Sequence, residues 1–379
     1  MKILPFVRPI FPSIEEWSMH FSECYATRYF ANNGPCVQRF EHYAAMRLGR
    51  GIGKPKHRDF IATASGTAAI TIALLALKSP GFVICPAYTF IATAQAIRAA
   101  GCIPVFCDVN RYTGELSPGS VAETLKKLAQ LQMKCTAIVH VRAFGMCRDL
   151  SPMEEMAAQY KLPLVIDSAA ALGGQMAWKA AVGQQGLAET FSLHATKVLP
   201  VGEGGLIATT RPLGRLMRIA RNFGLTGSKT DGSDGFTGIN GKMTEMAAAI
   251  GCAAIGTAFS QQRQHRRFIA QEYAKRVAPI PSAAQIGYPS WQTFPIRYPN
   301  STATGKALDA LQAVGIIAKR AYRPVLSQHP PLKWDTPNAT ALAATTLCLP
   351  IYADMTDEEQ DFIINSLPQA ESIQPWPAA

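Results

Sequence analysis

The sequence lacks a membrane-spanning segment. Its longest run of small and apolar residues, 247–259, is shorter than the roughly 20 apolar residues that a transmembrane helix needs. Pro5, Pro9 and Pro12 interrupt the N-terminal residues, where a signal peptide would have a continuous apolar core. We therefore expect a soluble, cytoplasmic protein that does not associate with a membrane.

The sequence also lacks clustered cysteines and clustered basic residues. No two of its nine cysteines form a Cys-x-x-Cys pair, which argues against a metal site and a disulfide framework and agrees with reduced thiols. The formal net charge is +11, but Lys and Arg are dispersed along the chain. A nucleic-acid surface would gather them among aromatic residues, so we expect no nucleic-acid partner and an anionic small molecule instead.

What the chain has is size and a regular alternation of apolar segments. Its 379 residues, 48% of them hydrophobic, predict a large domain over 1–260 and a smaller C-terminal α/β domain over 261–379. We predict strands at 60–64, 82–85, 104–107, 137–141, 162–166 and 190–193, and helices at 37–47, 68–77, 88–100, 121–132, 151–160, 244–259, 261–277, 305–314 and 357–367. This alternation is typical of an α/β fold with a mostly parallel sheet covered by helices. Ligands bind such sheets at the carboxyl ends of the strands, where polar clusters lie at 65–67, 167–168 and 192–197.

The stretch 191–205 has the most distinctive chemistry. It reads as a short strand with Ser192 and His194 on one face, a turn that carries Lys197, and a glycine-rich loop. A lysine that is partly desolvated and close to another cation has a lowered pKa, and its free amine can form a Schiff base, as in pyridoxal phosphate enzymes. The residues alone leave open that Lys197 is a solvated surface charge beside an ordinary loop.

The turn Ser65-Gly66-Thr67 follows the first predicted strand and precedes an apolar helix. The partial positive charge of a helix N-terminus, with the hydroxyl of Thr67 as a further donor, can hold a phosphate. An ordinary N-cap by Ser65 or Thr67, without a ligand, explains the turn equally well.

Asp167 follows the strand predicted at 162–166. It can cap the next turn, or it can keep the pyridine nitrogen of pyridoxal phosphate protonated, which makes the ring an electron sink. Phe90 can cover the face of such a ring by stacking, or it can be a core aromatic residue.

Taken together, these motifs resemble the DegT/DnrJ/EryC1/StrS aminotransferases, the sugar aminotransferases among the fold-type I pyridoxal phosphate enzymes. The matching segments are Gly34-Pro35 with Phe40-Glu41, then 65–69, 86–93, 104–109, 165–173 and 191–205, and finally Leu349-Pro350 with Met355-Thr356. The resemblance implies a pyridoxal 5'-phosphate enzyme that moves an amino group from glutamate or glutamine to a keto sugar, with a nucleotide-linked sugar as the acceptor expected from the family's pattern.

The resemblance also implies roles for single residues. Lys197 is the Schiff-base lysine, Asp167 the partner of the ring nitrogen and Phe90 the stacking aromatic residue. The residues placed around the phosphate are Gly66, Thr67, Ala68, Ser192 and Asn240. Asn240 matches an asparagine that the family contributes from the neighbouring subunit, which implies a homodimer with shared active sites.

The chain departs from the family pattern at two places. Ala170 stands where a histidine or glutamine usually contacts the ring hydroxyl, and Asn240 is flanked by Ile239, Gly241 and Lys242 instead of aromatic residues and an arginine. These departures keep open a regulatory or structural protein that binds the cofactor without turnover. A second alternative is a dehydratase or eliminase of the same family. Dehydrating members have a histidine at the lysine position, so Lys197 favours amino transfer.

Overall fold

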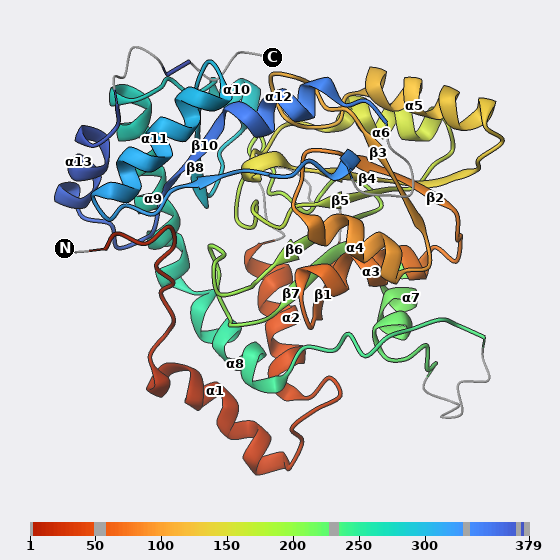
Figure 1. Cartoon of the computed structure of the whole chain (residues 1–379). Helices are drawn as coiled ribbons and strands as arrows, with labels where there is room; N and C mark the ends of the chain where they lie inside the picture. Colours follow the sequence, from red (N-terminus) through yellow and green to blue (C-terminus); the bar gives the residue numbers. More distant parts are fainter. Residues whose placement is uncertain (1–2, 49–57, 227–234, 329–333, 369–372, 375–379) are drawn as a thin grey trace.

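Two β-sheets organise the chain in the computed structural model (Figure 1), which describes residues 3–48, 58–226, 235–328, 334–368 and 373–374. The larger sheet has seven strands in the order β1-β7-β6-β5-β4-β2-β3. Its strands are β1 (Arg58–Thr63), β2 (Phe82–Pro86), β3 (Ile103–Cys107), β4 (Cys135–Val141), β5 (Leu164–Asp167), β6 (Ala188–Ser192) and β7 (Gly205–Thr210). Only β7 runs antiparallel to its neighbours, β1 and β6, so the predicted mostly parallel sheet is confirmed.

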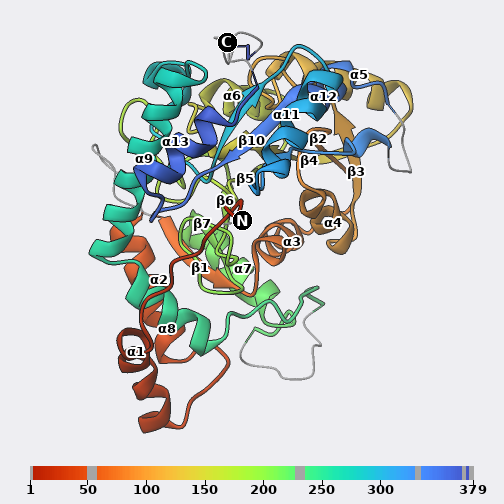
Figure 2. The same cartoon turned by 60° about the vertical axis from the view of Figure 1, so that its left-hand side comes forward.

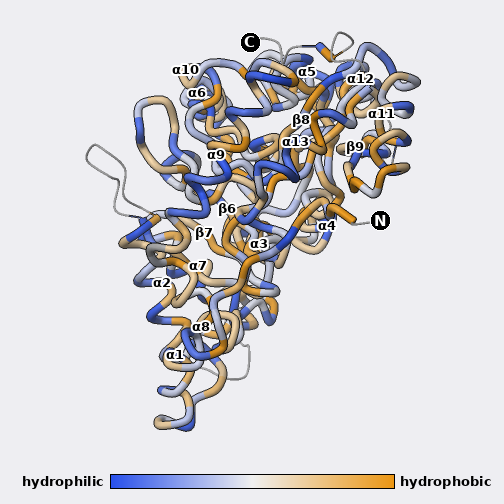
Figure 3. The backbone as a smooth tube through the Cα atoms, turned by 90° about the vertical axis from the view of Figure 1, so that its left-hand side faces the viewer, coloured by the Kyte–Doolittle hydropathy of each residue, from blue (hydrophilic) through white to orange (hydrophobic). Residues whose placement is uncertain are grey.

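Helices cover both faces of this sheet. Along β4, Val139 packs toward α3 (Gly66–Ala76), α4 (Ile91–Ala99) and α7 (Arg211–Arg221), whereas Ile138 packs toward α5 (Pro118–Gln130) and α6 (Ser151–Gln159). The second face is completed over β1, β7 and β6 by α2 (Pro35–Arg47) and α8 (Glu245–Ala254). Because the strands are buried on both faces, most residues of β2, β3, β4 and β5 are apolar, and Figure 3 shows hydrophobic chain around β6, β7 and α3.

A smaller antiparallel sheet follows, with strand order β8-β10-β9. Its strands and the helices of this part are α9 (Thr257–Arg276), α10 (Ala283–Ile286), β8 (Thr293–Arg297), α11 (Ser301–Ala313), β9 (Lys319–Arg320), α12 (Pro337–Thr345), β10 (Thr346–Pro350) and α13 (Asp357–Asn365). The N-terminal residues pack against this C-terminal part of the chain (Figures 1 and 2), where Leu4 bridges Ile316 and Arg8 pairs with Asp354 at 2.9 Å. Helix α9 spans residue 260, and the division into domains 1–260 and 261–379 remains a proposal.

Several elements differ from the sequence prediction. Helices α1 (Ile14–Thr27), α7 and α12 and strand β7 were not predicted, although Ser13 and Glu16 form a capping box that marks the start of α1. The helix predicted at 88–100 begins only at Ile91, because Phe90 is extended and forms its N-cap. The helix predicted at 244–259 is divided by Gly256, which is the N-cap of α9.

In the described part of the chain, no helix has the length and apolar character that crossing a membrane requires. From the sequence, its prolines predict a disordered tail at 375–379, and these residues lie outside the described part of the chain.

Candidate active site

Five candidate residues lie at one edge of the large sheet. Because β7 is antiparallel to both of its neighbours, β1 runs in the same direction as β6, β5 and β2, and their carboxyl ends share an edge. Beside these ends lie Gly66 and Thr67 after β1, Phe90 after β2, Asp167 in β5 and Ser192 in β6. Ligands of parallel sheets bind in this position.

Asp167 is a buried carboxylate held by two donors. Its Oδ2 accepts a hydrogen bond from Thr93 Oγ1 at 2.8 Å, and its Oδ1 accepts one from the Ala169 N–H at 3.1 Å. Burial raises the pKa of Asp167, while these two hydrogen bonds and the charge of Lys197 oppose the rise. A carboxylate that is oriented and shielded from water in this way can pair with a cationic ring nitrogen.

Lys197 lies in a tight turn beyond β6. Its N–H donates to His194 O at 2.8 Å, and its Nζ donates to Gln292 Oε1 at 3.3 Å. Burial lowers the pKa of Lys197, and the charge of Asp167 opposes this shift. The sequence reasoning expected a neighbouring cation as a further cause, whereas desolvation is the cause that the structure gives.

The strand expected at 190–193 is β6, which ends at Ser192. His194 therefore does not share a strand face with Ser192, and that expectation was wrong. After Ser192 the chain folds back on the glycine-rich loop, with the Leu193 N–H bonded to Gly204 O at 2.8 Å. The His194 ring stays within the turn, with Nδ1 2.9 Å from Thr196 Oγ1.

The N-terminus of α3 forms a cradle next to Ser192. A Cβ on Gly66 would lie 2.8 Å from Ser192 Cβ, so a glycine is needed for the helix to approach this closely. Ser65 caps the helix by accepting the Ala68 N–H at 3.0 Å, as one reading of the sequence expected. Within the described residues, the N–H groups of Gly66 and Thr67 have no acceptor, which leaves them available to an anion such as a phosphate.

Phe90 and Asn240 differ from the other candidates in their surroundings. The Phe90 side chain is 64% exposed at the start of α4, so its ring is available for stacking. Asn240 is also exposed, and its backbone bridges Asn222. The next residue, Gly241, accepts the Ala64 N–H at 2.8 Å, but no described contact joins the Asn240 side chain to the other candidates.

Ala170, the departure from the family pattern, packs beside Gly145. A Cβ on Gly145 would lie 2.3 Å from Ala170 O and 3.3 Å from Ala170 Cβ, and Gly145 has a φ of +78°. The Ala170 side chain is half-exposed. A longer side chain at position 170 would therefore have to point away from Gly145, toward the open side.

Sequence reasoning missed three residues at this edge. Thr93 lies within the segment 86–93 that carried part of the family resemblance, so its place in that segment could have indicated it. Gln292 and Tyr322 come from the C-terminal part of the chain, where no local pattern marks them. Tyr322 stacks on Phe144 with ring centroids 5.7 Å apart. The pKa of Tyr322 is raised mainly by burial, and the charge of Asp167 raises it further.

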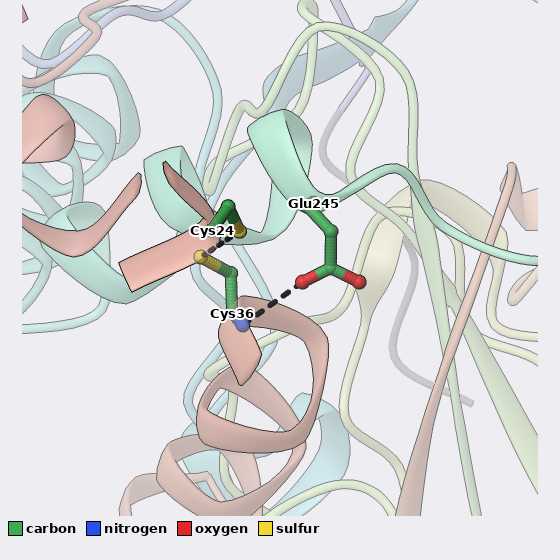
Figure 4. Close-up of side chains that lie close together, drawn as sticks. All are labelled: Cys24, Cys36 and Glu245. Atoms are coloured by element: carbon green, nitrogen blue, oxygen red, sulfur yellow. Dashed lines mark hydrogen bonds between the residues drawn. The ribbon is translucent and has the colours of Figure 1, made fainter. Parts of the chain in front are cut away.

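A separate buried cluster joins Cys24, Cys36 and Glu245 (Figure 4), with the two sulfur atoms 3.5 Å apart. The Glu245 carboxylate accepts the N–H groups of Gly34 at 2.6 Å, Cys36 at 2.9 Å and Val37 at 3.1 Å. These bonds satisfy the free N-terminus of α2 and explain why the carboxylate is buried. We therefore assign the cluster a structural role.

Comparison with known proteins agrees with this geometry. Residues 14–368 match the model of the DegT/DnrJ/EryC1/StrS aminotransferase family. GDP-perosamine synthase of Caulobacter vibrioides is 28% identical, over 92% of this chain and 93% of its own. The 3-oxo-glucose-6-phosphate:glutamate aminotransferase of Bacillus subtilis is also 28% identical, over 88% of this chain and 76% of its own. The crystal structure of DesI in the presence of its TDP-sugar product superposes with a TM-score of 0.84 at 27% identity, covering 97% of this chain and 92% of DesI.

The match covers nearly the whole chain and confirms the resemblance that the motifs indicated. It also confirms the expected fold type, the expected enzyme class and pyridoxal phosphate as the cofactor. The chain belongs to the DegT/DnrJ/EryC1/StrS aminotransferase family.

Proposed function

We propose that this protein transfers an amino group from glutamate or glutamine to a nucleotide-linked keto sugar. The observation that carries the proposal is the placement of Lys197, with its lowered pKa, near the buried Asp167 and the open N-terminus of α3. A nucleophilic amine, a partner for a ring nitrogen and a phosphate cradle then lie at one sheet edge. These are the three groups that pyridoxal phosphate chemistry needs from a protein.

The described residues fit the cofactor. Gly66 and Thr67 would hold its phosphate through their free N–H groups, with the Ser192 hydroxyl beside them. The Ala68 N–H already donates to Ser65, so we assign Ala68 a place beside the phosphate and no hydrogen bond to it. Phe90 would cover one face of the ring.

Lys197 and Asp167 have different tasks in this proposal. When bound, pyridoxal phosphate supplies an electron sink for the electron pair that remains when the substrate carbon loses a proton. The Lys197 amine anchors the cofactor and, once released, accepts the proton from the substrate carbon at Nζ and later returns it. Asp167 keeps a negative charge next to the ring nitrogen.

The proposed substrates rest on charge and on the relatives. The formal net charge of +11 suits an anionic substrate. The name of the Caulobacter relative refers to GDP-perosamine and that of the Bacillus relative to glutamate, and the DesI crystal contains a TDP-sugar. These names support a keto sugar, with a nucleotide-linked one in first place, as the acceptor and glutamate as the first donor to test.

The experiment is a two-stage assay of the purified protein with pyridoxal phosphate. Donor amino acids are first screened singly for bleaching of the visible band of the bound cofactor, with glutamate or glutamine expected to be active. The protein converted by that donor is then mixed with nucleotide-linked keto sugars, and the aminated product is sought by mass spectrometry. Bleaching without amination of any keto sugar would contradict the proposed acceptor class but not the enzyme class.

We further propose a homodimer with shared active sites. Helix α1 packs on α8 but leaves Ile14, Met19 and Tyr25 exposed, and a monomer would leave this apolar surface in water. The exposed Asn240 has no described contact with the other candidates in its own chain, as expected if it serves the neighbouring subunit.

Mixing two inactive variants tests the shared site. Lys197→Ala and Asn240→Ala each damage both sites of a homodimer, but a mixed dimer has one site with neither change. Refolding or coexpressing the two together should therefore restore activity to about one quarter of the wild-type value, because half of the dimers are mixed and half of their sites are intact. If the mixture is no more active than the separate variants, Asn240 acts within its own chain or outside the site.

Ala170 provides a test of the cofactor's orientation. Ala170→Gln should add a hydrogen-bonding group on the open side of position 170, and a hydrogen bond to a charged group contributes about 1.5–3 kcal/mol. The pH titration of the cofactor's visible band should shift, with some loss of activity toward the natural substrate. Ala170→Leu adds similar bulk without the hydrogen bond and is the matched control. An unchanged titration and substrate range in Ala170→Gln would show that position 170 does not face the cofactor.

A further inference from the structure

Gln292 is the side chain that accepts a hydrogen bond from the Lys197 amine. The distance from Lys197 Nζ to Gln292 Oε1 is 3.3 Å, although the two residues are 95 positions apart in the sequence. Gln292 immediately precedes β8 of the small sheet. The C-terminal part of the chain therefore reaches the reacting nitrogen atom.

The segment that carries Gln292 is fixed against the loop that follows Asp167. The Ser290 hydroxyl donates to Leu172 O at 2.8 Å, and the Tyr288 N–H donates to Gln175 O at 2.6 Å. Trp291 is buried beside Phe294, with ring centroids 5.7 Å apart. Contacts on both sides of Gln292 thus hold its backbone in place, so that its position relative to Lys197 is determined by the fold.

We propose that Gln292 is a further catalytic residue, which accepts a hydrogen bond from the free amine of Lys197 and holds it ready for proton transfer. This inference rests on the proposed role of Lys197. The amine is free only during the part of turnover in which the substrate has displaced it. Gln292 then gives it a defined position from which to receive and return the proton.

The chemistry of the amide explains why a glutamine suits this position. Asp167, on β5, is the carboxylate whose charge acts on Lys197, and it is required by the ring nitrogen. A second carboxylate at position 292 would stabilise the protonated amine, which cannot accept a proton. The neutral amide accepts the hydrogen bond without adding charge, so that burial can keep the pKa of Lys197 low.

His194 and Tyr322 are further ionisable side chains at this edge of the sheet. On its own turn, His194 Nε2 lies 3.5 Å from Glu203 Oε1. From the C-terminal part, Tyr322 has its pKa raised by burial and remains neutral near pH 7. The described segment 288–292 contains no Asp, Glu, Lys, Arg or His. A charge placed at position 292 would therefore act on Lys197 directly.

The test measures the Lys197 amine itself, in the full chain freed of cofactor. Acetic anhydride labels free amines, and peptide mapping by mass spectrometry follows the labelling of Lys197 as a function of pH. Gln292→Glu should move the labelling curve of Lys197 to higher pH by about one unit or more, because it adds a negative charge within hydrogen-bonding distance. Gln312→Glu makes the same change on the exposed surface of α11 and should leave the curve in place.

A second variant separates catalysis from folding. Gln292→Met keeps the length of the side chain but removes the acceptor, so kcat should fall about tenfold or more, while the KM of the amino donor and the thermal midpoint change little. An unshifted labelling curve in a folded Gln292→Glu protein would overturn the inference, and so would wild-type kcat in Gln292→Met. The labelling experiment needs no substrate. The shift of the Lys197 labelling curve in Gln292→Glu is therefore expected even if the proposed substrate class is wrong.

Discussion

Replacing Lys197 with alanine should abolish amino transfer while the fold is retained. The variant loses the amine that anchors the cofactor and the group that moves the proton, and proton transfer by a positioned side chain alone contributes about 10²–10⁴-fold. We expect a loss of about 10⁴-fold or more in kcat. Reduction of the wild-type holoenzyme with borohydride, followed by peptide mapping, should place the cofactor on Lys197.

The matched control is Lys306→Ala, which removes an exposed lysine from α11. This variant should keep wild-type activity and the visible band of the bound cofactor. Circular dichroism and thermal unfolding should be the same for both variants as for the wild type. If the reduced cofactor is found on another lysine, the assignment of Lys197 is wrong, whatever the activity of the alanine variant.

Replacing Asp167 with asparagine should slow proton transfer more than it weakens cofactor binding. The amide can still accept the hydrogen bond from Thr93 or the Ala169 N–H, so the side chain should keep its place. It has no charge to hold a proton on the ring nitrogen, and the loss of one oriented electrostatic group at a reacting centre costs about 10²–10³-fold in rate. We expect this loss in single-turnover kinetics, with a much smaller change in cofactor affinity.

The matched control is Asp309→Asn, which removes the same charge from an exposed residue of α11, away from the site, and should have wild-type kinetics.

The Asp167→Asn variant also changes the charge acting on Lys197. Since Asp167 raises the pKa of Lys197, its removal should move the labelling curve of Lys197 in the cofactor-free chain to lower pH. Near-normal turnover in this variant would mean that Asp167 is only a turn cap.

The sequence was sufficient to predict the class of fold and to propose where the site lies. Strands that are buried on both faces, such as the one containing Val165 and Ile166, are recognisable because they appear in the sequence as continuous apolar runs, whichever helix covers them. The polar residues that end such segments then lie at the carboxyl edge of a parallel sheet. The motifs around Ser65 and Lys197 then indicated the family, because the sequences of these two turns are specific to it.

The sequence did not predict the elements whose identity depends on distant partners. Strand β7 follows a glycine-rich loop and runs antiparallel between β1 and β6. It is a strand because it pairs with those two strands, which lie elsewhere in the sequence. Helix α1 was not predicted either, and its contacts with α8, like the bridge between Leu4 and Ile316, join residues far apart in the sequence.

The sequence alone indicated Lys197 and Asp167 as candidates for the chemistry, whereas the tertiary structure decided how their reactivity is set and added Gln292. The low pKa of Lys197 comes from desolvation, and burial is a property of the whole packed molecule. Asp167 on β5 accepts a hydrogen bond from Thr93 on helix α4, and the lysine amine donates one to Gln292, which immediately precedes β8. Hydrogen bonds of this kind act over about 3 Å between residues whose sequence separation carries no signal, so only the folded chain reveals them.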